Sequence, residues 1–138
     1  MIPTVRFGRT GLELTRIALG GFPFGGVNRA RGWDPFTADG RRKALATVQA
    51  ALDAGINAID TAPSYGDGNS ESIIGEATQG RRDEFTLMTK VSYRGATPDG
   101  VMRSVESSLE CVCEHWHAVS RGLYWQVSPM TSSAVGVS

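Results

Sequence analysis

The chain has 138 residues, 41% of them hydrophobic, which is enough apolar material for one globular domain with a real core. Its 14 basic and 14 acidic residues cancel to a formal net charge of zero, so the charge balance gives no reason to expect nucleic acid or an anionic membrane as a partner. No apolar run reaches the length of a membrane span and the first twenty residues do not resemble a secretory leader, so we expect a cytoplasmic protein.

The N-terminal residues predict a hairpin followed by a strand. Residues 5–7 and 12–14 flank a glycine-containing turn at 8–11, which is the pattern of a short β-hairpin. Residues 17–19 are apolar throughout, as in strands that are buried on both faces of a parallel sheet. The segment 22–36 is rich in glycine, proline and aromatic residues and lacks periodicity. It predicts a long loop, and such loops in compact domains are often functional.

A helix is predicted from Thr37 onward, followed by a second strand. Apolar residues recur on one helical face at spacings of three and four. These residues are Ala44, Leu45, Val48, Ala51 and Leu52. Gly55 lies just past the last of them and predicts the end of the helix. The second strand, 56–60, follows directly.

A second helix and a third strand come next. After a glycine-containing loop at 66–68, either Asn69 or Ser70 is expected to cap the helix, and Gly80 is expected to end it. Residues 85–91 then predict the third strand. Its edge would be unpaired if no further strand followed.

A third helix is predicted to begin at Thr97, whose hydroxyl can cap it, with Pro98 in its first turn. Residues 122–127 are a candidate fourth strand. Strands that alternate with helices indicate parallel βαβ units with right-handed crossovers. An open doubly wound sheet and the start of a (β/α)₈ barrel both fit this order.

Three polar residues follow or end the predicted strands. Asp60 ends the second strand, Tyr65 lies in the loop after it, and Lys90 is near the end of the third. In a barrel all three would open onto the C-terminal face, where the active sites of that fold lie. The pattern therefore predicts that the three side chains lie together.

Carbonyl reduction is the chemistry that needs such a trio. A hydride arrives from a nicotinamide, and a proton must reach the oxygen of the former carbonyl. A tyrosine, whose ordinary pKa is about 10, donates a proton more readily when a nearby cation stabilises the phenolate. We therefore assign Tyr65 as the general acid, Lys90 as the cation that tunes it, and Asp60 as the counter-charge that keeps Lys90 protonated.

The ordered motifs resemble the aldo/keto reductase superfamily. Residues 54–66, Ala-Gly-Ile-Asn-Ala-Ile-Asp-Thr-Ala-Pro-Ser-Tyr-Gly, followed by Asn69-Ser70-Glu71 and Ile74-Gly75, are similar to the family's signature around its catalytic Asp and Tyr. Residues 87–91, Leu-Met-Thr-Lys-Val, resemble its catalytic-lysine strand. Residues 6–12 with 19–21 resemble its opening hairpin and first barrel strand, and 104–110 its Ser-Leu-rich third helix. The resemblance covers roughly residues 4 to 110.

The resemblance implies a fold, a cofactor and a substrate class. The fold would be α/β, an N-terminal hairpin followed by the first three or so units of a (β/α)₈ barrel. The chain would use NADPH to reduce aldehydes or ketones, with a small carbonyl compound as its partner and no metal. Gly21 and Phe22 follow Gly20 and resemble the family's first-strand loop, which approaches the nicotinamide. The resemblance implies that Gly21, Phe22 and Asp60 bind the cofactor. Gly20 and Gly21 could instead be present because a tight turn at this point requires glycine.

The sequence departs from the family after residue 110. The resemblance implies a fourth catalytic residue, a His at the end of the fourth strand, but here residues 111–117, Cys-Val-Cys-Glu-His-Trp-His, take over. His115 and His117 come too early to replace it, and the two cysteines form neither a disulfide framework nor a zinc spacing. We therefore expect a partial barrel over 1–110 and a divergent tail over 111–138.

An incomplete barrel changes the expected function. A barrel of this type needs eight strand-helix units, and in the resembling family most NADPH contacts come from later loops. We therefore hypothesise that the isolated chain has little or no reductase activity. Two alternatives stay open. One is a noncatalytic binding or interaction module, for instance one that pairs its open barrel edge with another chain or with a copy of itself, and the other is a misassembled coding sequence.

Overall fold

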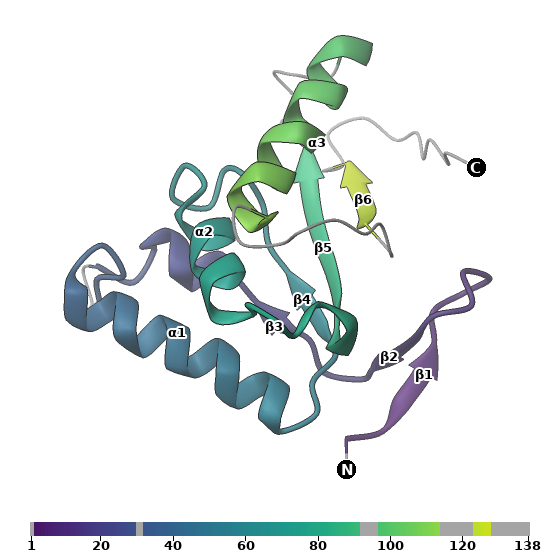
Figure 1. The fold of residues 1–138 in the computed structure, drawn as a ribbon, viewed down its shortest axis with the longest axis horizontal. Helices are drawn as coiled ribbons and strands as arrows, with labels where there is room; N and C mark the ends of the chain where they lie inside the picture. Colours follow the sequence, from purple (N-terminus) through teal and green to yellow (C-terminus); the bar gives the residue numbers. More distant parts are fainter. Residues whose placement is uncertain (1, 30–31, 92–96, 114–122, 128–138) are drawn as a thin grey trace.

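The computed structural model of the chain describes residues 2–29, 32–91, 97–113 and 123–127, the last by its backbone. The described part contains an antiparallel hairpin, a four-stranded sheet, three α-helices and two short 3₁₀ helices (Figure 1). In chain order they are β1 (Thr4–Arg6), β2 (Glu13–Thr15), β3 (Leu19–Gly20), η1 (Phe22–Gly25), α1 (Ala38–Asp53), β4 (Ala58–Asp60), α2 (Asn69–Ala77), η3 (Arg82–Glu84), β5 (Thr86–Val91), α3 (Pro98–Cys113) and β6 (Leu123–Val127).

The four-stranded sheet is parallel throughout and runs in chain order, β3-β4-β5-β6. Ile59 of β4 is in register with Leu19 of β3 and Leu87 of β5. A doubly wound sheet reverses its strand order at a switch point, whereas a (β/α)₈ barrel adds each strand beside the last. The order therefore confirms the predicted fold class, the opening units of a barrel whose sheet is not closed within the described residues.

The sheet corrects one expectation about its edge. The third predicted strand, β5, is not an edge strand, because β6 pairs with it from Leu87 opposite Leu123 to Val91 opposite Val127. The candidate fourth strand at 122–127 is thus confirmed as β6. Among the described strands, the outer positions of the sheet belong to β3 and β6.

The hairpin packs at the opposite end of the sheet from Asp60. Its strands pair Thr4 with Thr15 and Arg6 with Glu13, which shifts the predicted strands by one residue. Asn57, just before β4, accepts a hydrogen bond from the Thr15 amide at 2.7 Å and donates one to the Glu13 carbonyl at 2.8 Å. One side chain therefore ties the hairpin to the start of β4.

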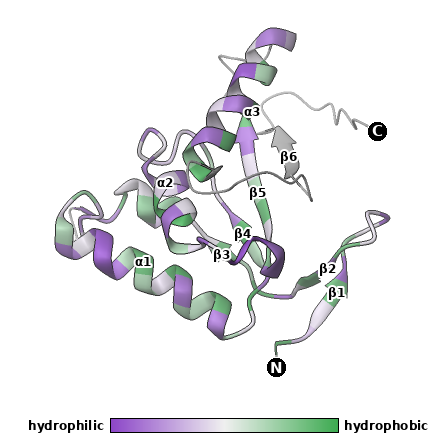
Figure 2. Ribbon diagram, viewed as in Figure 1, coloured by the Kyte–Doolittle hydropathy of each residue, from purple (hydrophilic) through white to green (hydrophobic). Residues whose placement is uncertain are grey.

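Helix α1 begins and ends as its sequence predicts. The Thr37 hydroxyl accepts a hydrogen bond from the Gly40 amide at 3.1 Å, and Gly55 follows the helix with a φ of 86°, which favours glycine. Apolar and polar bands alternate along α1 in Figure 2, and Ala44, Val48 and Leu52 make up its buried face.

Helix α2 departs from prediction at both ends. Its N-cap is Gly68, which makes no side-chain cap, so neither Asn69 nor Ser70 caps it. The side-chain Nδ2 of Asn69 instead donates to the Phe24 carbonyl at 2.8 Å, and the Ser70 hydroxyl donates to the Gly21 carbonyl at 2.9 Å. The helix ends at Ala77, before Gly80. Both predicted caps are therefore replaced by tertiary contacts to the loop after β3.

Helix α3 begins where predicted, since the Gly100 amide donates to the Thr97 hydroxyl at 3.1 Å. It runs to Cys113, past the boundary expected at 110, and that boundary stays a prediction. A Cβ on Gly75 of α2 would lie only 3.0 Å from the carbonyl oxygen of Cys111, so the glycine lets the two helices approach closely.

The hydrophobic core lies between the sheet and the helices. Its buried members are Phe24, Ala44, Val48, Leu52, Ile59, Ile73, Ile74, Ala77, Phe85, Leu87 and Val112. They come from all three α-helices, from β4 and β5, and from η1 and the residue just before β5. The core therefore fixes the strands whose ends carry Asp60 and Lys90. None of the helices in the described ranges is long and apolar enough to cross a bilayer.

Candidate active site

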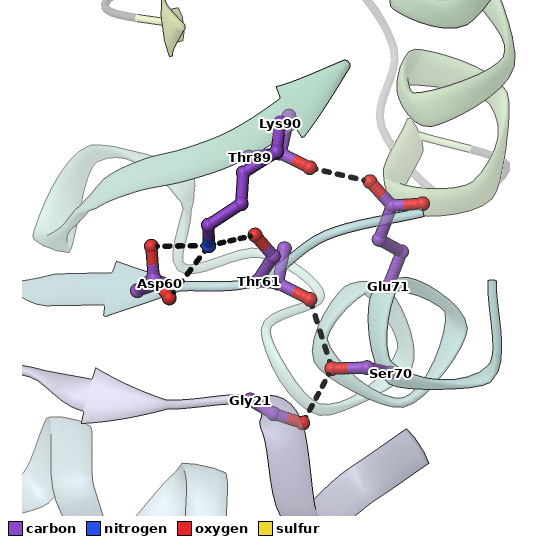
Figure 3. A network of polar contacts seen from close by, with 7 residues as sticks. All are labelled: Gly21, Asp60, Thr61, Ser70, Glu71, Thr89 and Lys90. Atoms are coloured by element: carbon purple, nitrogen blue, oxygen red, sulfur yellow. Dashed lines mark hydrogen bonds and ion pairs between the residues drawn. The ribbon is translucent and has the colours of Figure 1, made fainter. Parts of the chain in front are cut away.

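Two of the three predicted polar residues face each other across neighbouring strands. Asp60 is the last residue of β4, and Lys90 is one residue before the end of β5 (Figure 3). The register pairs Asp60 with Met88, and the strands are parallel, so their carboxyl ends lie at one edge of the sheet. Tyr65 lies in the loop from β4 to α2 and is partly exposed.

The Lys90 ammonium is hydrogen-bonded to three oxygen atoms. Its Nζ lies 2.8 Å from each carboxylate oxygen of Asp60 and 2.9 Å from the carbonyl oxygen of Thr61. Three N–H donors thus meet three acceptors, which is the full donor count of an ammonium group. The predicted pairing of Lys90 with Asp60 is confirmed, and the side chains are 21% and 36% exposed.

Tyr65 contacts both this cation and an aromatic ring. The Lys90 nitrogen lies 5.0 Å from the centroid of the Tyr65 ring, within the range of a cation–π contact. The ring of Phe22 meets Tyr65 edge-to-face, with centroids 5.1 Å apart. The structure therefore brings Asp60, Tyr65 and Lys90 together, with Phe22 beside them.

The surroundings of Lys90 favour its charged form. Burial acts to lower its pKa, but the interactions with Asp60 and with the Tyr65 side chain outweigh burial and raise the pKa above its ordinary value. Lys90 therefore stays a cation at neutral pH, next to the tyrosine.

Glycines set the position of the Tyr65 loop. A Cβ on Gly25 would lie 2.6 Å from the carbonyl carbon of Tyr65, and one on Gly66 would lie 2.7 Å from Gly25. Gly66, Asp67 and Gly68 all have positive φ angles, of 68°, 54° and 87°, which turn the chain sharply before α2. The two loops can touch backbone to backbone because neither carries a side chain at the contact.

The two residues predicted to approach a cofactor lie in different settings. Gly21 is packed inside the protein: its amide donates to the Asp60 carbonyl at 2.7 Å, and a Cβ there would lie 2.6 Å from the Ser70 hydroxyl. The ring of Phe22 is 52% exposed beside Tyr65. An accessible aromatic ring next to a partly exposed polar trio fits the reacting end of a nicotinamide.

Sequence reasoning placed four buried polar residues within the family-like motifs but assigned them no role in the site. Thr61 and Ser70 share a hydrogen bond of 2.8 Å between their hydroxyls, and Thr89 donates to the Glu71 carboxylate at 2.8 Å (Figure 3). Each of the four is at most 1% exposed. Burial raises the pKa of Glu71, against the opposing effect of the Thr89 hydrogen bond. The available signal was their position, directly next to Asp60 and Lys90 and at the start of α2.

Neither the two histidines nor a metal-binding cluster can be added to the site from the described residues. His115 and His117 lie outside the described residues. Within the described ranges, no group of three His, Cys, Asp or Glu side chains is arranged to hold a metal ion.

Comparison with known proteins gives one consistent answer. The sequence model described as "Aldo/keto reductase family" matches residues 16–112. The chain is 40% identical over 111 residues to the aldo-keto reductase YhdN of Bacillus subtilis, covering 73% of this chain and 31% of the relative. It is 34% identical over 110 residues to L-galactose dehydrogenase of Arabidopsis thaliana, covering 75% and 32%.

Solved structures agree. The crystal structure of an aldo-keto reductase from Klebsiella pneumoniae in complex with NADPH superposes with a TM-score of 0.67 at 32% identity, covering 81% of this chain and 36% of that one. The chain therefore spans about a third of the length of the proteins it matches.

Proposed function

The chain belongs to the aldo/keto reductase family, and on that premise we propose that its site is built for the NADPH-dependent reduction of an aldehyde or ketone. Asp60, Tyr65 and Lys90 are the catalytic residues of this proposal. The observation that carries it is the Lys90 ammonium, bound by three oxygen acceptors and lying 5.0 Å from the ring centre of Tyr65.

The roles follow from charge and position. NADPH, when bound, supplies the hydride. The hydroxyl of Tyr65 gives a proton to the carbonyl oxygen of the substrate, and the adjacent cation stabilises the phenolate that remains. Asp60 balances the charge of Lys90, so that the ammonium remains protonated in a partly buried setting.

The cofactor would be held at its reacting end by Gly21, Phe22 and Asp60. The exposed Phe22 ring lies beside Tyr65 and offers an apolar surface for a flat ring, while the amide and carbonyl of Gly21 hold the backbone of that loop in place. The Klebsiella pneumoniae relative is described in complex with NADPH, which supports this choice of cofactor. The substrate is proposed only as a carbonyl class, since relatives differ in the substrates that their names give.

We further propose that the 138 residues on their own turn over little or no substrate. The described sheet has four parallel strands, whereas a closed barrel of this kind has eight. An unclosed sheet leaves the carboxyl-end loops without half of their usual neighbours, and precise placement of cofactor and substrate is what catalysis requires.

A chimera tests the residue assignment directly. Residues 16–112 would replace their counterpart in the Klebsiella pneumoniae enzyme, and NADPH oxidation with a reactive aldehyde would be followed. We expect activity that depends on Tyr65, measured against Tyr65→Phe, in the chimera and none in the isolated chain. A folded chimera that binds NADPH but shows no Tyr65-dependent oxidation would overturn the assignment, and Tyr65-dependent turnover by the isolated chain would overturn the proposed inactivity.

A second candidate function is a noncatalytic module that associates with copies of itself. The position of β6 at the edge of the described sheet favours it, because an edge strand offers unpaired backbone groups to another chain. Light scattering tests it: a single defined oligomer supports this candidate, whereas a monomer or heterogeneous aggregates contradict it.

A further inference from the structure

Two buried hydroxyls connect α2 to the strand ends that carry the site. The Ser70 hydroxyl, in the first turn of α2, donates to the carbonyl oxygen of Gly21 at 2.9 Å and lies 2.8 Å from the Thr61 hydroxyl (Figure 3). Ser70 and Thr61 are both completely buried. No solvent competes for these hydrogen bonds, so each is stronger than its exposed counterpart.

The direction of the hydrogen bonds follows from counting protons. Ser70 has one hydroxyl hydrogen, and it is given to the Gly21 carbonyl. In the contact between the two hydroxyls, Thr61 is therefore the donor and Ser70 the acceptor. The result is a one-way chain from Thr61 through Ser70 to Gly21, in which each bond polarises the next.

Thr61 is also the residue that holds Lys90 from behind. Its carbonyl oxygen accepts a hydrogen bond from the Lys90 ammonium at 2.9 Å, and its amide donates to the Met88 carbonyl at 2.8 Å. The side chain, amide and carbonyl of Thr61 are thus all hydrogen-bonded. The partners of the amide and the carbonyl lie on β5, whereas the partner of the side chain, Ser70, lies on α2.

We propose that Thr61 and Ser70 are positioning residues, whose hydroxyl chain to the Gly21 carbonyl holds the Thr61 carbonyl against the Lys90 ammonium. The consequence for catalysis rests on the proposed function, in which Lys90 tunes Tyr65. The same chain anchors the backbone just before Phe22, whose ring contacts Tyr65. One buried hydroxyl pair therefore stabilises the backbone next to both residues that contact the tyrosine.

The chain offers a direct reporter, because Lys90 and Lys43 are its only lysines. Lys43 lies on α1 with a side chain that is 61% exposed, so it serves as an internal reference in the same sample. A short pulse of a water-soluble acetylating reagent, followed by mass spectrometry, gives the ratio of the Lys90 rate to the Lys43 rate. A bound, charged ammonium reacts slowly, since acylation requires the free amine.

Four variants separate positioning from general stability. Thr61→Val removes the hydroxyl at nearly constant shape, Ser70→Ala breaks the chain at its middle, and Thr61→Ser keeps the hydroxyl. Thr78→Val removes another fully buried hydroxyl of the α2 region, one that donates to the Ile74 carbonyl one helical turn earlier. We expect the rate ratio to rise about fivefold in the first two variants, as for the loss of one hydrogen bond, and to stay unchanged in Thr61→Ser and Thr78→Val.

The proposal is overturned by two outcomes. One is an unchanged ratio of the Lys90 to the Lys43 acetylation rate in both Thr61→Val and Ser70→Ala. Asp60→Asn serves as the positive control, because it should raise this ratio. The other is an equal rise in Thr78→Val, which would mean general loosening. Circular dichroism checks folding, and either hydroxyl-deleting variant suffices if the other does not fold. The assay contains no cofactor or substrate, so its failure leaves the proposed function intact, and an inactive chimera would leave this result standing.

Discussion

The ammonium nitrogen of Lys90 lies 2.8 Å from both carboxylate oxygens of Asp60, although the two residues are 30 positions apart in the chain. The register of β4 and β5 produces this contact, because the parallel strands end at the same edge of the sheet. The pair is partly shielded from water, which makes it a stronger contributor than an exposed ion pair.

Asp60→Asn should therefore lower the free energy of unfolding at pH 7 by about 1 kcal/mol, since Lys90 keeps only neutral acceptors. Urea denaturation measures this. The matched control is Asp39→Asn, which removes the ion pairs of a more exposed carboxylate with Arg42 and Lys43 and should cost less. A cost at position 39 equal to that at position 60 would contradict the account.

The same pair predicts a pH dependence. Folding raises the pKa of Lys90, so the folded state holds that proton more tightly than the unfolded state does. The resulting stabilisation is complete below the ordinary lysine pKa and is lost as the pH rises through the raised value. The wild type and Asp60→Asn should converge in stability at strongly alkaline pH, and a gap that widens there would contradict the sign.

Glu71 predicts a pH dependence of the same sign in a lower pH range. Burial raises its pKa, so folding favours the protonated carboxyl, and stability falls as the pH rises from the ordinary glutamate pKa through the raised one. Glu71→Gln keeps an acceptor for the Thr89 hydroxyl and carries no charge. The variant should therefore gain about 1 kcal/mol of stability over wild type when the pH is raised from 5 to 7.5. Paired urea titrations at the two pH values measure this, and a flat difference would argue against a strained carboxylate.

Gly25→Ala tests the contact between the two loops. Its new Cβ would meet the backbone of Tyr65 at 2.6 Å, so the loop must shift, at a cost of about 1–3 kcal/mol. Gly20→Ala is the matched control, because a Cβ there meets nothing within 4 Å. Thermal unfolding compares the two, and equal midpoints would show that the loop contact is not tight.

The helix ends were predicted correctly where the signal for them lies within the helix or directly beside it. The Thr37 and Thr97 caps and the Gly55 termination depend on residues within one turn of each helix, and the structure reproduces them. The meeting of Asp60 with Lys90 could also be predicted, because parallel strands end at one edge.

The contacts that could not be predicted are long-range. Ser70 has the residue type and position of an N-cap, but its hydroxyl bonds to Gly21, 49 positions away. A serine at the start of a helix can either cap the helix or bond to a distant backbone group, and the sequence alone does not distinguish the two. The position of the distant partner in the fold decides which bond forms. The pairing of β6 with β5 could be predicted only as a candidate fourth strand at 122–127, since a short strand's neighbour depends on the whole sheet.

The most direct test of the central claim is single-turnover hydride transfer in the chimera that carries residues 16–112. NADPH-loaded protein would be mixed with a reactive aldehyde in a stopped-flow instrument, as wild type and as Tyr65→Phe. We predict that loss of the proton donor slows NADPH oxidation by about 100-fold or more, with unchanged NADPH affinity. Equal rates in the two proteins would contradict the assignment of Tyr65, and with it the carbonyl-reducing site.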